Sequence, residues 1–141
     1  MRQGFTLIEL CFVLAILALL VGLAVPTHEV LYRRAQASEA RAMLSAIAHA
    51  ELQHHRDHGH YLACPAEGPV PSQPTRFPSS TSCWKTLHIA LHDPVRYRYG
   101  VTVAGNSFEV VAEADLDADG VGSRFSLDGR TLHITEVDPH E

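Results

Sequence analysis

The stretch that decides the fold is Gly4-Phe5-Thr6-Leu7-Ile8-Glu9-Leu10, and an apolar run continues it to Val25. As a helix, residues 5–25 would measure about 32 Å, enough to cross the hydrocarbon core of a bilayer. Glu9 is the one charged side chain in this run, and its burial in lipid costs about 2.5–3.5 kcal/mol. Because the run holds no cation, we expect the partner of Glu9 to be water, a chain terminus or another molecule.

This heptapeptide, placed after a very short basic leader, resembles the class III signal of type IV pilins and of the pseudopilins of type II secretion. The resemblance implies that prepilin peptidase removes the leader, residues 1–4, by cutting between Gly4 and Phe5. It also implies N-methylation of Phe5 and a role in assembly for Glu9, which neutralises the terminal amine of a neighbouring subunit. Residues 5–25 then form a transmembrane helix that becomes the filament core.

A proline ends the fully apolar run. Pro26 removes one helical hydrogen bond, and Gly22 lies four residues earlier, so we expect a helix kink here. Pilins carry a proline at the corresponding place. Residues 26–58 keep a helical spacing of apolar side chains and predict an amphipathic helix, with Gly59 as its C-terminal cap.

Residues 59–94 change in character, because prolines, serines and threonines predict an irregular loop. Cys64 and Cys83 lie in this exported part, where an even pair of cysteines usually forms a disulfide. That bond would pin the loop, whereas Cys11 lies in the apolar run. The segment Cys83–Leu87 predicts a helical turn that places Trp84 on the core; a strand over residues 87–91 is the alternative.

Residues 95–141 predict an antiparallel sheet with four strands. Apolar and polar residues alternate over 95–103 and 108–113, with Gly105-Asn106 as the turn between them. Two further strands fit 122–127 and 131–137, and Asp128-Gly129 predicts a type I′ turn. The fold class is therefore α+β. The resemblance implies the pilin fold, in which a long N-terminal helix packs on this sheet.

An acidic segment, residues 115–120, lies between the second and third expected strands. Asp115, Asp117 and Asp119 alternate before Gly120, which matches the first half of a calcium loop. Glu113 or Asp128 could complete the ligand set from neighbouring strands, and calcium sites occur among pseudopilins. The acid expected at the end of such a loop is absent, so a plain acidic turn is the favoured interpretation.

Histidines gather at the end of the long helix, at positions 49, 54, 55, 58 and 60. The spacing of His54 and His58 can chelate zinc, but no complete ligand set follows. A solvated polar face is therefore the favoured interpretation. The sequence shows no catalytic motif and requires no cofactor, and its net charge of −5 indicates no nucleic-acid interface.

The function expected from the resemblance is that of a structural, minor subunit of a pilus-like filament. Its expected partners are other pilins, prepilin peptidase, the inner-membrane assembly platform and the membrane. The expected route runs from a bacterial inner-membrane prepilin with a cytoplasmic N-terminus to the periplasm or a surface pilus. A type II secretion pseudopilin and a monomeric membrane-anchored binding protein are the alternatives. A conventional signal peptide fits poorly, because Glu9 would interrupt its apolar region.

Overall fold

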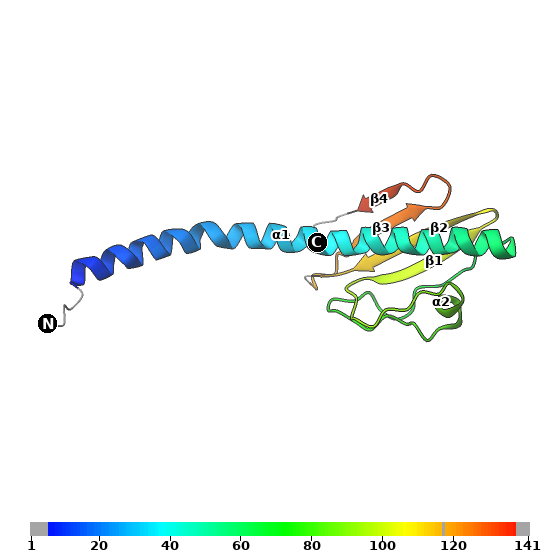
Figure 1. Ribbon diagram of the computed structural model, residues 1–141, viewed down its shortest axis with the longest axis horizontal. Helices are drawn as coiled ribbons and strands as arrows, with labels where there is room; N and C mark the ends of the chain where they lie inside the picture. Colours follow the sequence, from blue (N-terminus) through cyan, green and yellow to red (C-terminus); the bar gives the residue numbers. More distant parts are fainter. Residues whose placement is uncertain (1–5, 117, 138–141) are drawn as a thin grey trace. The chain divides into compact units, whose positions relative to one another are not determined.

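The computed structural model describes residues 6–116 and 118–137, without the side chains of residues 23–30 and 33. The chain divides into two units, residues 1–35 and residues 36–141. The element order is helix, short helix and four strands (Figure 1): α1 (Leu7–His58), α2 (Ser82–Thr86), β1 (Arg98–Ala104), β2 (Ser107–Ala114), β3 (Ser123–Asp128) and β4 (Ile134–Val137).

The backbone of α1 is helical through both Gly22 and Pro26 and ends at His58. Gly59 follows with φ +79°, and its N–H donates to the carbonyl of His55 at 2.8 Å. A glycine in this left-handed conformation is the common way to end a helix. The predicted cap is therefore confirmed.

The four strands form an antiparallel meander in the order β1-β2-β3-β4. The two residues Gly105 and Asn106 connect β1 to β2, because Ala104 pairs with Ser107. Gly105 has φ +57°, a conformation that glycine adopts at little cost. The α+β fold with a four-stranded antiparallel sheet is thus the one expected from the sequence.

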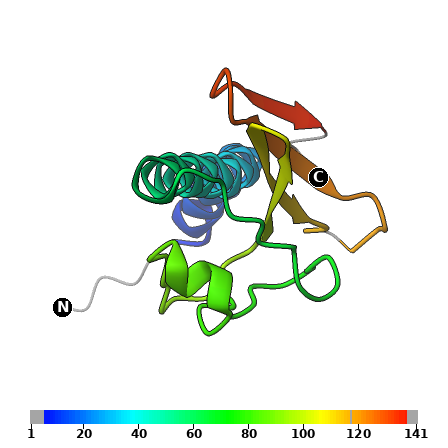
Figure 2. The same cartoon turned by 90° about the vertical axis from the view of Figure 1, so that its right-hand side faces the viewer.

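Within the second unit, the part of α1 after residue 36 lies along one face of the sheet (Figure 2). Small and branched side chains recur on its buried face at helical spacing, which lets the helix approach the strands closely. The buried residues of this face are Ala37, Ala40, Leu44, Ile47 and Ala48. Facing them are the alternate residues of the strands, chiefly Tyr97, Tyr99, Val101, Phe108, Val110, Ala112, Phe125 and Leu127.

The loop between α1 and β1 pairs with the chain at two points, one in β1 and one just before it. Cys64 exchanges backbone hydrogen bonds with Val101, and Thr75 exchanges them with Val95. Because Val95 pairs with the loop and the chain bends after it, β1 begins at Arg98 rather than at 95. The helical turn that places Trp84 in the core is confirmed, since α2 buries this side chain completely; the alternative strand over 87–91 is wrong.

The turn between β3 and β4 differs from the prediction of a type I′ turn. Gly129 does not have a positive φ, whereas Leu132 does, and β4 begins only at Ile134. The Asp128 carboxylate accepts hydrogen bonds from the N–H groups of Arg130 and Thr131, which favours a longer loop. Gly129 serves close packing instead, because a Cβ atom there would lie 2.5 Å from the Phe108 ring.

Candidate functional site

The N-terminal end of α1 is built around Thr6 and Glu9. The Glu9 N–H donates to the Thr6 carbonyl at 3.1 Å and lies 3.4 Å from the Thr6 hydroxyl. This is the N-cap arrangement of a Thr-x-x-Glu sequence, and it places a carboxylate in the first turn, where the helix dipole favours negative charge. No ion pair joins Glu9 to another residue of the described ranges. The carboxylate is thus held at the helix start and is open to a partner.

The first turns of α1 expose apolar side chains on every side. Their exposed fractions run from 42% at Val13 to 81% at Leu7. The set comprises Leu7, Ile8, Leu10, Phe12, Val13, Leu14, Ile16, Leu17, Leu19, Leu20 and Val21. Apolar surface of this extent indicates contact with another molecule or a membrane. Across residues 6–116 and 118–137, no helix meets the combined length and apolarity needed to cross a membrane.

The two head cysteines are buried neighbours. The structure holds Cys64 and Cys83 as buried thiols in contact with each other, and the disulfide between them stays a prediction. Burial raises the pKa of the Cys64 thiol, and its hydrogen bond with Cys83 adds to the increase. Cys64 also pairs with β1 at Val101, and Cys83 lies in α2. A bond between them would therefore connect the start of the loop to the short helix.

The acidic segment, residues 115–120, lies between β2 and β3. Asp117 lies outside the described residues. The Asp115 carboxylate accepts the backbone N–H of Gly120 at 3.2 Å. The Asp119 carboxylate accepts the backbone N–H of Val121 at 2.7 Å. Asp128 lies at the far end of β3, about 17 Å along the strand from its start at Ser123. Its carboxylate caps the β3–β4 turn, so it does not join the acidic segment. In the described part of the chain, no group of three His, Cys, Asp or Glu side chains is placed to hold a metal ion.

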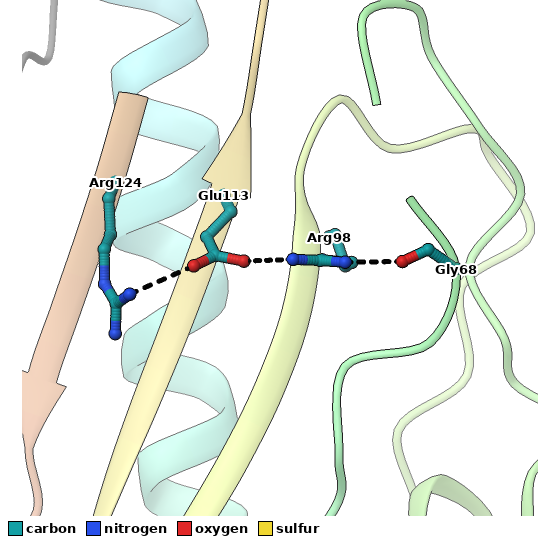
Figure 3. Close-up of polar contacts among 4 residues, drawn as sticks. All are labelled: Gly68, Arg98, Glu113 and Arg124. Carbon is teal, nitrogen blue, oxygen red and sulfur yellow. Dashed lines mark hydrogen bonds and ion pairs between the residues drawn. The ribbon is translucent and has the colours of Figure 1, made fainter. Parts of the chain in front are cut away.

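A row of charges crosses the sheet (Figure 3). Arg98, Glu113 and Arg124 occupy paired positions on three neighbouring strands, and the Glu113 carboxylate joins both guanidinium groups. Arg98 also donates to the carbonyl of Gly68 in the loop. The row therefore fastens the Pro-rich loop to the sheet, and its charges are already paired with one another.

Comparison with known proteins agrees with the features of the N-terminal helix. A family model for the prokaryotic N-terminal methylation motif matches residues 1–25. The chain is 33% identical over 75 residues to the type IV major pilin protein PilE1 of Neisseria gonorrhoeae, covering 53% of this chain and 46% of that one. It is 36% identical over 61 residues to a fimbrial protein of Neisseria meningitidis serogroup B, covering 43% and 36%.

These matches support an assignment to the type IV pilin family. This is a family of structural subunits rather than of enzymes. The chain spans less than half the length of the curated relatives it matches. No solved structure matches it.

Three features of this chain were missed from the sequence. The first is the Thr6 cap, although Thr-x-x-Glu before an apolar run is a recognisable signal. The others are Glu51 and His54, which are 0% and 6% exposed although both side chains are polar. His54 is thus buried and does not lie on the predicted solvated face. Its position on the same helical face as Ile47 and Glu51 was the available signal.

Proposed function

We propose that this chain is a minor structural subunit of a type IV pilus-like filament, made as a prepilin in the bacterial inner membrane. The proposal rests on two features seen together. Residues 7–21 expose apolar side chains, and one carboxylate, Glu9, lies among them in the first helical turn. Such a surface gains free energy only when lipid or neighbouring helices cover it.

Processing gives Glu9 its partner. Prepilin peptidase hydrolyses the bond between Gly4 and Phe5, which leaves a new positively charged amine at Phe5 that is then methylated. In the membrane, with the N-terminus cytoplasmic, this amine and Glu9 both lie in a layer where an unpaired charge is costly. Contact between the amine of one subunit and Glu9 of the next satisfies both groups, so assembly is favoured for correctly aligned subunits.

The rest of the chain supports other parts of the proposal. Gly22 and Pro26 give the helix a place to bend during assembly. The partners are other pilins, the peptidase and the inner-membrane assembly platform. Filament assembly needs no cofactor, and the three aspartates of residues 115–119 act as a turn. Calcium binding measured by titration calorimetry would instead favour a pseudopilin.

The deciding experiment combines N-terminal mass analysis with one matched pair of variants. The mature chain should begin at N-methylated Phe5. Glu9→Ala should lower the amount of sheared filament at least about tenfold, which corresponds to about 1.4 kcal/mol of lost docking free energy. Glu109→Ala, which removes an exposed glutamate of the head, should leave assembly unchanged.

Two results would overturn the proposal. A mature chain that starts at Met1 or after Ala24 would exclude peptidase processing at Gly4. Normal biological activity of an uncut Glu9→Ala chain would instead support a membrane-anchored binding protein.

A further inference from the structure

Three histidines meet where α1 ends and the following segment turns back. The rings of His54 and His58 stack with centroids 4.3 Å apart and planes inclined by 19°. His60 approaches His54 edge-on at 5.2 Å and lies 6.3 Å from His58. The ring centroids of three groups that can each take up a proton therefore lie within 6.3 Å of one another. Two positive charges at this separation would repel.

His54 is the buried member of this cluster. Its side chain is 6% exposed, and its Nε2 atom has no hydrogen-bond partner among the described residues. A neutral imidazole tolerates that position. A protonated one would carry a charge and a second donor into a place where no described residue accepts the donor, which is costly.

The groups around His54 offer little compensation for a positive charge. Two carboxylates of α1 lie near His54 in the helix, Glu51 and Asp57. Both oxygens of Asp57 already accept from the Gln53 amide, at 3.1 and 2.9 Å, and its charge raises the pKa of His54 less than burial and the other two histidines lower it. On the α2 side, a cavity of about 210 Å³ borders His54 and is lined by Thr86, Leu87 and His88. The titratable group from that side is thus another histidine, and the cavity gives water a route to the cluster.

Glu51 connects the cluster to the segment after the helix. It is 0% exposed, and its Oε2 accepts the backbone N–H of Leu62 at 2.9 Å. The charge of His60 lowers the pKa of Glu51, although burial, the larger effect, raises it. Two residues beyond Leu62, the chain pairs with β1 through Cys64. The protonation states of His60 and Glu51 therefore affect the hydrogen bond that holds residues 59–64 against the helix.

We propose that His54, His58 and His60 form an acid-sensitive latch, whose protonation loosens the end of α1 and residues 59–64. Burial lowers the pKa of His54 below its usual 6.5, and the charges of His58 and His60 lower it further. A histidine with a lowered pKa contributes stability above its unfolded-state pKa and loses it as the pH falls through that value. The latch is closed at neutral pH and weakens below about 6.5.

The test measures hydrogen exchange of residues 59–64 in the full chain in detergent micelles, between pH 7.5 and 5.5 and corrected for intrinsic rates. Protection of the Leu62 amide should fall at low pH, by about tenfold for each unit by which the His54 pKa is depressed. His54→Gln should remove most of this dependence. His49→Gln, which alters an exposed histidine of the same helix, should keep it.

The outcomes separate the latch from other causes. Protection that does not change with pH, or that changes equally in His54→Gln, would overturn the proposal. If Glu51→Gln instead abolishes the dependence while His54→Gln retains it, the carboxyl is the sensor and the histidine latch is wrong. If His54→Gln does not fold, NMR titration of the wild-type imidazoles decides, since a His54 midpoint at or above that of His49 contradicts the latch.

Discussion

Two stretches of the same helix, residues 7–21 and residues 37–48, are both rich in apolar side chains but differ in what covers them. Leu14 in the first is 56% exposed, whereas Leu44 in the second is 0% exposed. Helix propensity does not separate the stretches, since both consist largely of good helix formers. The first has apolar residues all round, which suits a surface completed by other molecules, and the second has one apolar face, which suits a sheet.

The sharpest test of this difference truncates the same residue type in each stretch. Leu44→Ala removes a fully buried side chain and should lower the free energy of unfolding of the head by about 2–5 kcal/mol. Leu14→Ala should change it by less than about 0.5 kcal/mol. Urea unfolding in detergent, followed by Trp84 fluorescence, measures both. Similar losses in the two variants would show that the stretches depend on the same packing.

A second test compares two glycines. A Cβ atom on Gly129 would lie 2.5 Å from the Phe108 ring and 2.6 Å from the Phe108 carbonyl oxygen, so Gly129→Ala should cost about 1–3 kcal/mol. A Cβ atom on Gly22 would meet nothing within 4 Å. Gly22→Ala should therefore leave the unfolding midpoint of the head unchanged. A stable Gly129→Ala head would mean that the β3–β4 loop moves freely away from β2.

The charged row across the sheet should have a smaller effect. Glu113→Ala leaves the half-buried Arg98 without its carboxylate partner and should lower the free energy of unfolding by about 1 kcal/mol. Glu109→Ala, on the same strand and exposed, is the control. The difference between the two variants should shrink at high salt, because screening weakens the ion pairs of the wild type. A difference independent of salt would assign the effect to packing.

The smallest expected effect concerns the pH dependence of the head. Backbone N–H groups of Thr131 and Arg130 lower the pKa of Asp128 from its usual 3.8. A carboxyl with a lowered pKa contributes stability above its unfolded-state pKa and loses it as the pH falls. Urea midpoints should therefore decline below about pH 4, and less steeply in Asp128→Asn. Identical slopes would mean that Asp128 does not contribute to acid sensitivity.

Much of the fold follows from local pattern. The alternation through Tyr97, Tyr99 and Val101 identifies the inner face of β1, and Gly59 marks the end of α1. These features depend on neighbours in the chain, so sequence spacing is enough to find them. The motif at Gly4 to Leu10 is likewise local, and the family model matches it.

What the sequence did not predict depends on contacts between distant residues. The β3–β4 turn is shaped by Phe108, which approaches Gly129 from another strand. Burial of Glu51 depends on Leu62 beyond the helix end, and the separation of Asp128 from Asp115 depends on strand register. Such arrangements are set by tertiary packing, which outweighs the local preferences of the residues.

The bridge between Cys64 and Val101 has a consequence for the exposed edges of the sheet. By pairing with β1, the loop occupies part of the sheet edge that would otherwise recruit strands from other chains. On the opposite side, the unpaired edge belongs to β4, which is only 4 residues long. The sheet thus offers other chains little edge on which amyloid-like growth could begin.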